Sequence, residues 1–85
     1  MKDAKEFEVE MLAFGGGAIR IVDVPVTELV TPFGEADQDY ILEQIFKYGQ
    51  NDFQPRKFPS VSVGDVIRFK GKRFEVSFLG FKELV

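Results

Sequence analysis

The sequence predicts an α+β fold in which a small antiparallel sheet of about four strands, in the order β-β-α-β-β, is covered by one helix. Residues 6–11 alternate apolar with acidic side chains, which is typical of a half-buried strand. Residues 40–46 carry an apolar stripe at helical spacing, and residues 67–78 alternate again around Gly71. One sheet covered by one helix is an economical way to bury these faces, and the chain is expected to form a single domain, 1–85.

The first two strands, 6–14 and 18–24, are expected to pair as a hairpin. Along the first strand the apolar face is Phe7, Val9 and Met11, and the acidic face is Glu6, Glu8 and Glu10. The glycine segment Gly15–Gly17 then leads to the second strand, where Ile19 and Ile21 alternate with Arg20. Two strand-like runs around a short glycine connection are typical of a β-hairpin.

The middle of the chain predicts a crossover followed by a helix. Residues 25–34 contain two prolines and are expected to be irregular. The helix is predicted at 37–48, with its apolar stripe at Tyr40, Ile41, Leu42, Ile45 and Phe46. Asp37 is suited to be the N-cap, and Gly49 is expected to end the helix in a left-handed conformation.

The last part of the chain predicts a second hairpin. A type II′ turn with Gly71 and Lys72 at its centre would pair Phe69 with Phe74 and Arg68 with Glu75. The buried face in this register is Ile67, Phe69, Phe74, Val76 and Phe78. Ser60–Val63 alternates as well and adds the option of a short extra strand.

The amino-acid composition limits the kinds of catalytic and metal site that the chain can form. The chain has no Cys and no His, so it lacks thiolate nucleophiles and the commonest zinc ligand and general base. An enzyme would have to rely on Asp52 or Asp65 with a Lys or Tyr, and no spacing supports such a pair. We therefore expect no enzyme activity, no metal and no cofactor. No apolar run reaches the length of a membrane span and residues 1–10 are charged, so a cytoplasmic location is expected.

Charge is unevenly distributed along the chain. Residues 1–50 carry four basic and ten acidic side chains, a balance of −6, whereas residues 51–85 carry seven basic and four acidic, a balance of +3. One interpretation is a solvated outer strand face. The other is a nucleic-acid contact through Arg68, Lys70, Lys72 and Arg73, helped by Arg56 and Lys57 and by stacking on Phe53 or Phe58.

The loop after the helix is the candidate partner-binding segment. Its residues are Asn51, Asp52, Phe53, Gln54, Arg56 and Lys57. Loops that carry side-chain amides, an arginine and a bulky apolar residue often make contacts. The alternative is that Asn51 and Asp52 bond to nearby backbone and that Phe53 folds onto the core.

Three stretches resemble the YodL-like family. They are Asn51–Pro55, the Ser-Val-Ser-Val-Gly-Asp-Val-Ile run at 60–67, and Phe74–Val76 with Gly80-Phe81. The resemblance spans residues 40–84. It implies a small non-enzymatic accessory protein of a mobile element, such as a phage or plasmid, that binds another macromolecule. A protein is the expected partner, and a homodimer would cover an open edge of the sheet.

A weaker similarity is to ASCH domains, small β-barrels suspected of binding RNA. It is carried by Val63–Phe69, which matches a Val-Gly-Asp-x-Ile-x-Phe strand. The charged Lys and Glu of the family signature are replaced here by Asn51 and Gln54. The similarity therefore implies nucleic-acid binding without that signature's charges.

Overall fold

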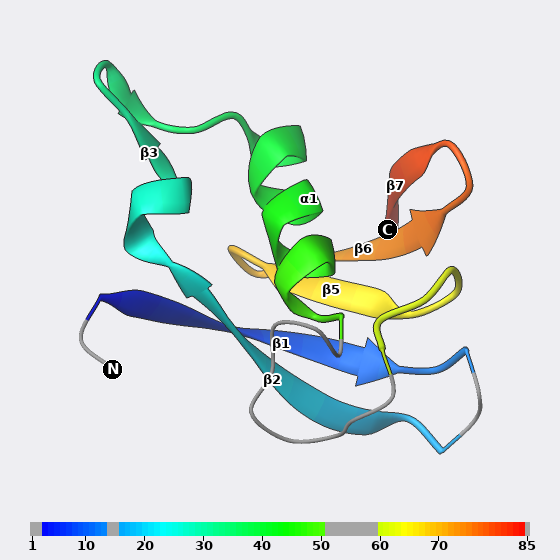
Figure 1. Cartoon of the computed structure of the whole chain (residues 1–85). Coiled ribbons are helices and arrows are strands. Elements are labelled where there is room, and N and C mark those ends of the chain that lie inside the picture. Colours follow the sequence, from blue (N-terminus) through cyan, green and yellow to red (C-terminus); the bar gives the residue numbers. More distant parts are fainter. Residues whose placement is uncertain (1–2, 14–15, 51–59, 85) are drawn as a thin grey trace.

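A five-stranded antiparallel sheet with one helix across one face forms the body of the molecule (Figure 1). The computed structural model describes residues 3–13, 16–50 and 60–84. The strand order is β2-β1-β5-β6-β7. The main elements are β1 (Ala4–Met11), β2 (Ala18–Pro25), α1 (Gln38–Tyr48), β5 (Val66–Phe69), β6 (Lys72–Ser77) and β7 (Gly80–Leu84). The α+β class is confirmed, and the strand number is corrected from about four to five.

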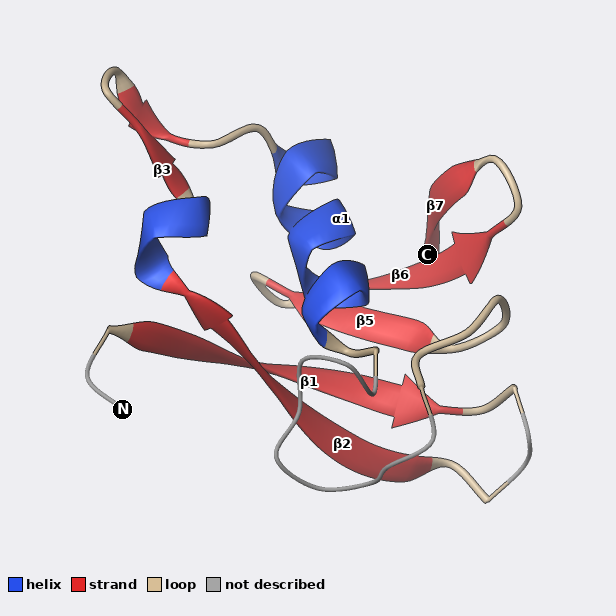
Figure 2. Cartoon of the chain, in the orientation of Figure 1, coloured by secondary structure: helices blue, strands red, loops and turns tan. Residues whose placement is uncertain are grey.

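The crossover between β2 and α1 is more regular than predicted. A 3-10 helix at Val26–Glu28 is followed by a small ribbon of β3 (Val30–Thr31) and β4 (Gly34–Glu35), which stands apart from the main sheet (Figure 2). The two prolines do not interrupt these elements because one ends β2 and the other lies in the turn between β3 and β4.

The β1–β2 hairpin has the predicted inner face on β1 and a different one on β2. Phe7 and Val9 are buried against the helix. Because Val9 pairs with Arg20, the inner residues of β2 are Arg20, Val22 and Val24. Ile19 and Ile21 consequently lie on the outer face, 45% and 44% exposed.

The helix has the predicted length, but both of its ends differ from expectation. Asp37 is at the N-cap position, yet its side chain makes no capping hydrogen bond to the described backbone. Gly49 has φ −80° and is therefore not left-handed. A Cβ at Gly49 would lie 2.4 Å from Val61 Cγ2, so glycine is needed there for close packing of the returning chain. The Val61 N–H donates to the Gly49 carbonyl at 3.2 Å.

The register of the β5–β6 hairpin was predicted wrongly by two residues. Its central turn residues are Lys70 and Gly71, with φ 52° and 78°, the combination that a type I′ turn requires. Ile67 therefore pairs with Phe74, and Arg68 pairs with Arg73 instead of Glu75. A shift of two keeps each side chain on its face. The four inner residues Ile67, Phe69, Phe74 and Val76 are buried as predicted.

Beyond β6 the chain turns back instead of continuing the core. Ser77 pairs with Gly80 and opens β7, a strand that the sequence reasoning missed. Phe78, expected on the buried face, is in this turn and is 91% exposed. Gly80 has φ 135°, a backbone conformation that residues with a side chain rarely adopt. Glycine at this position therefore permits the tight reversal of the chain.

Ser60–Val63 is not a strand; it leads into a turn held by Asp65. The Asp65 carboxylate accepts the Ser62 N–H and the Ala13 N–H, each at 2.8 Å. Gly64 has φ 101°, and its N–H donates to the Val76 carbonyl. Through these hydrogen bonds the Val63-Gly64-Asp65 motif links the chain just after β1, the turn before β5, and β6. The helices of residues 3–13, 16–50 and 60–84 do not include one with the length and apolar character of a membrane span.

Candidate interaction site

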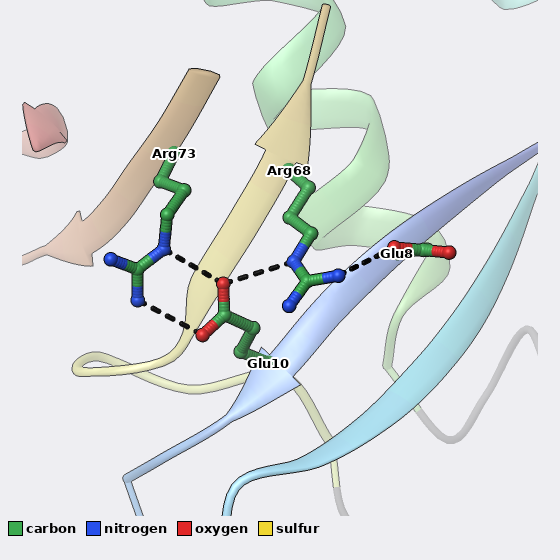
Figure 3. A network of polar contacts seen from close by, with 4 residues as sticks. All are labelled: Glu8, Glu10, Arg68 and Arg73. Atoms are coloured by element: carbon green, nitrogen blue, oxygen red, sulfur yellow. Dashed lines mark hydrogen bonds and ion pairs between the residues drawn. The ribbon is translucent and has the colours of Figure 1, made fainter. Parts of the chain in front are cut away.

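Of the four basic candidates, Arg68 and Arg73 are on the sheet face opposite α1, and both converge on one carboxylate (Figure 3). Lys72 is on the α1 face of β6, and Lys70 is in the β5–β6 turn. Glu10 Oε2 accepts hydrogen bonds from Arg68 Nε at 3.0 Å and from Arg73 Nε at 2.8 Å. Its Oε1 accepts a further bond from the Arg73 guanidinium at 2.9 Å. Arg68 also donates to Glu8 at 2.9 Å.

Strand register explains this convergence. Glu8 is opposite Arg68, and Arg68 is opposite Arg73, so two arginines face each other across β5 and β6. Directly opposed like charges destabilise a sheet unless an opposite charge lies between them. Glu10 supplies that charge and is only 8% exposed.

The contacts among Glu10, Arg68 and Arg73 shift the pKa values of these three groups in the stabilising direction. Hydrogen bonding from Arg73, and then from Arg68, lowers the pKa of Glu10, although its burial acts in the opposite sense. The hydrogen bonds to Glu10 raise the pKa of both Arg68 and Arg73. All three groups are therefore charged at neutral pH, and the network is held together by charge-assisted bonds.

The two lysine candidates for nucleic-acid contact are also paired. Lys70 Nζ lies 2.5 Å from Glu35 Oε1 on β4, and Lys72 Nζ lies 4.0 Å from Glu83 Oε2 on β7. The bond to Lys70 lowers the pKa of Glu35. Each of the four basic candidates thus has a carboxylate partner, three of them from the acidic first half of the chain.

The partner-binding candidates Asn51, Asp52, Phe53, Gln54, Arg56 and Lys57 lie outside the described residues, as does Phe58. Gln50, at the start of that segment, is described. Its Nε2 donates to the Phe46 carbonyl at 2.9 Å and to the Val61 carbonyl at 3.1 Å. Gln50 therefore joins the helix end to the chain leading into β5.

Two hairpin turns of the molecule are built alike. In Thr31-Pro32-Phe33-Gly34 the Thr31 hydroxyl donates to the Gly34 carbonyl at 3.1 Å, and in Ser77-Phe78-Leu79-Gly80 the Ser77 hydroxyl donates to the Gly80 carbonyl at 2.9 Å. The closing glycines have φ 129° and 135°. A hydroxyl before two bulky residues and a glycine after them therefore fixes each turn.

Both turns hold large apolar side chains in solvent. Phe33 and Leu79 are each 99% exposed, and Phe78 is 91% exposed. Sequence reasoning missed these residues, because Phe33 was included in an irregular crossover and Phe78 in the core. A signal was present: hydroxyl-x-x-Gly between two strand-like runs is typical of a turn, and turn residues point outward.

Asp65, the enzyme candidate among the described residues, is a structural residue. Its carboxylate is fully buried and is bonded to two backbone N–H groups. Across residues 3–13, 16–50 and 60–84 no three acidic side chains gather closely enough to hold a metal ion.

Comparison with protein-family models, with curated proteins and with solved structures found no match to this chain. The similarities to the YodL-like family and to ASCH domains therefore stay predictions from sequence.

Proposed function

We propose that this chain is a small non-enzymatic protein-binding module that uses its two apolar turns as anchors. The observation that carries the proposal is the near-complete exposure of Phe33, Phe78 and Leu79 on turns whose backbone is fixed by hydroxyl hydrogen bonds. We call these three residues the turn anchors.

The turn anchors have the properties of binding hot spots. Tyr, Trp and Phe are enriched in protein interfaces, and an anchor gains most of its binding energy by entering a desolvated pocket of the partner. A turn that is already ordered loses little conformational entropy on binding. A single exposed apolar residue is ordinary on a protein surface, but two turns of the same construction that both present such residues require a reason beyond folding.

A protein partner is favoured over a nucleic acid by the ion pairs. Binding to phosphates needs basic groups that can neutralise them. Arg68, Lys70, Lys72 and Arg73 are each paired with a carboxylate, so a phosphate would have to displace Glu8, Glu10, Glu35 or Glu83. Among the described residues, the side chains of the turn anchors have no such partner to lose.

The resemblance to the YodL-like family adds a biological setting to the proposal. It would make the chain a cytoplasmic accessory protein of a mobile element. A homodimer fits the proposal as well, since β2 and β7 are the edges of the described sheet. In that case the partner of the turn anchors would be a second copy.

Site-specific photo-crosslinking tests the proposal. A benzophenone amino acid replaces Phe33 or Phe78, and in a control protein it replaces Glu43, which is exposed on α1. We expect positions 33 and 78 to capture the same protein from a lysate of the source cells, and position 43 to capture none of it. Excess unlabelled wild-type chain should compete, whereas excess of a Phe33→Ser, Phe78→Ser, Leu79→Ser variant should not.

The outcomes separate the alternatives. Equal competition by the triple variant, or equal capture from position 43, would overturn the role of the turn anchors. A crosslinked product of twice the chain mass identifies a homodimer. A product that nuclease treatment removes would favour nucleic-acid binding instead.

A further inference from the structure

The sheet opens at one end because the ladder between β1 and β5 is short. It covers only Glu8–Glu10 and Val66–Arg68, while the earlier residues of β1 pair with β2 alone. A hollow of about 350 Å³ lies between the diverging ends, Lys5–Glu8 on one side and Arg68–Gly71 on the other. A second hollow of about 200 Å³ lies beside it, next to the 3-10 helix. Both share Lys5, Phe7 and Phe69 as lining residues.

The wall between the two hollows is aromatic. The Phe7 and Phe69 rings are 6.0 Å apart between centroids and inclined at 42°. The smaller hollow is completed by apolar side chains from the crossover and the helix, namely Val26, Leu29, Val30 and Ile41. Its lining is thus apolar except for Lys5 and Glu35.

The two polar groups of the smaller hollow differ in their availability. Glu35 is paired with Lys70, and its pKa is lowered by that bond, so its charge is already balanced. Lys5 Nζ is 5.6 Å from the centroid of the Phe7 ring and forms no ion pair with any described residue. Glu35 thus interacts with two ammonium groups, Lys70 through a direct bond and Lys5 through space, so the mouth of the apolar hollow has an excess of one positive charge.

We propose that this hollow binds a small carboxylate with an apolar body about the size of a benzene ring. The body would rest on Phe7 and Phe69, and the carboxylate would pair with Lys5. The site is independent of the turn anchors.

Size and charge both limit the occupant. A volume of 200 Å³ equals that of about seven liquid water molecules and is below the range usual for drug-sized ligands. A ligand with an ammonium group would find Glu35 already occupied by Lys70. A neutral ligand of the same shape would fill the hollow and leave Lys5 unpaired.

Titration followed by ¹H–¹⁵N NMR tests the site, with benzoate, benzamide and benzylamine as probes of equal shape and different charge. In low salt at pH 7 we expect benzoate to produce saturable shifts in the amides of Phe7, Leu29 and Phe69. Lys5→Met keeps the aliphatic stem and removes the charge, and it should weaken benzoate about fivefold, as expected for one partly exposed ion pair. Benzamide should bind with the same weakened affinity to both proteins.

Two further variants complete the design. Val26→Phe places a larger side chain at the exposed rim of the hollow and should abolish the benzoate shifts while leaving the remaining spectrum intact. Lys82→Met, on the outer face of β7, is the matched charge control and should leave benzoate affinity unchanged. Equal binding of benzoate and benzamide to the wild-type chain, or unchanged benzoate affinity in Lys5→Met, would overturn the proposal. So would benzoate shifts that persist in Val26→Phe.

Discussion

The hairpins β5–β6 and β6–β7 share a strand, and each closes with a two-residue turn, yet their tips are opposite in chemistry. The first tip is Lys70-Gly71, which is polar and whose lysine is paired with Glu35 on β4. The second tip is Phe78-Leu79, which is apolar and almost fully exposed. Folding and solubility are sufficient to explain the first choice of residues. They do not explain the second, and this difference is the reason for proposing that the β6–β7 tip is a binding surface.

The largest expected effect concerns the strand that the two hairpins share. Phe74 is 2% exposed and is opposite Ile67 in the core. Phe74→Ala should lower the free energy of unfolding by about 3–5 kcal/mol, the usual range for truncating a buried phenylalanine. Urea denaturation measures the loss. A loss as small as that of Phe78→Ala, which truncates an exposed turn residue, would mean that Phe74 is not a core residue.

Replacing the glycines of the two turns by alanine should lower the stability by different amounts. Gly80 has φ 135°, outside the range open to other residues, so Gly80→Ala should cost of the order of 1–3 kcal/mol. Gly71 has φ 78°, close to the left-handed region, and Gly71→Ala should cost about 1 kcal/mol. Thermal unfolding of both variants compares the two turns directly. A larger loss of stability in Gly71→Ala than in Gly80→Ala would contradict the conclusion that the β6–β7 turn has the stricter backbone requirement.

A smaller and pH-dependent effect on stability should come from Glu10, which joins β1 to the β5–β6 hairpin through ion pairs with Arg68 and Arg73. The pKa of Glu10 is lower in the folded chain than its ordinary value of 4.5. The stabilisation from Glu10 is therefore complete above the ordinary value and is lost as the pH falls through the folded-state pKa. Glu10→Gln should be less stable than the wild type at pH 7, and the two proteins should converge as the pH falls from about 4.5 to 2.

Glu75→Gln is the control for the Glu10 prediction, since Glu75 is on the same face and forms no ion pair with the described residues. Its stability should follow the wild type throughout the same pH series. A Glu10→Gln difference that stays constant down to pH 2 would show that the network does not act through the charge of Glu10.

The smallest effect should come from the apolar tip itself. Phe78→Ser and Leu79→Ser should each change the free energy of unfolding by less than about 0.5 kcal/mol, because neither side chain loses a buried contact. Equilibrium unfolding and the crosslinking competition should be measured on the same preparations. A marked destabilisation would mean that the tip contributes to folding, and it would contradict the proposal that these residues are kept for binding.

Side-chain alternation predicted the parts of the fold that local pattern determines. It located α1, the inner faces of β1, β5 and β6, and the class of the fold. It did not determine which residues occupy the β5–β6 turn, because Lys70-Gly71 and Gly71-Lys72 both suit two-residue turns and a shift of two leaves every face unchanged. It also missed β7, because Phe78 continues the alternation of β6 past the point where the chain reverses.

The candidate site was less predictable for a different reason. The basic residues Arg68 and Arg73 were visible, but their partner Glu10 is about sixty positions away in the chain. The pairing depends on β1 lying between β2 and β5, a non-local choice that no local pattern contains. The turn anchors were missed for two reasons. Phe78 was assigned to the core because apolar residues in strand-like runs are ordinarily buried, and Phe33 was included in a crossover that was expected to be irregular.

The position of β1 in the sheet has a consequence for the protein while it is being synthesised. β1 and β2 leave the ribosome together, but β5, the second neighbour of β1, emerges only after residues 26–65 have followed. Until then β1 has an open edge of the kind that invites pairing with other nascent chains. Glu8 and Glu10, on its outer face, place negative charge along that edge and discourage such pairing. When β5 and β6 have been synthesised and pair with β1, the same two carboxylates accept hydrogen bonds from Arg68 and Arg73. The residues that discourage pairing with other chains before then also stabilise the finished sheet.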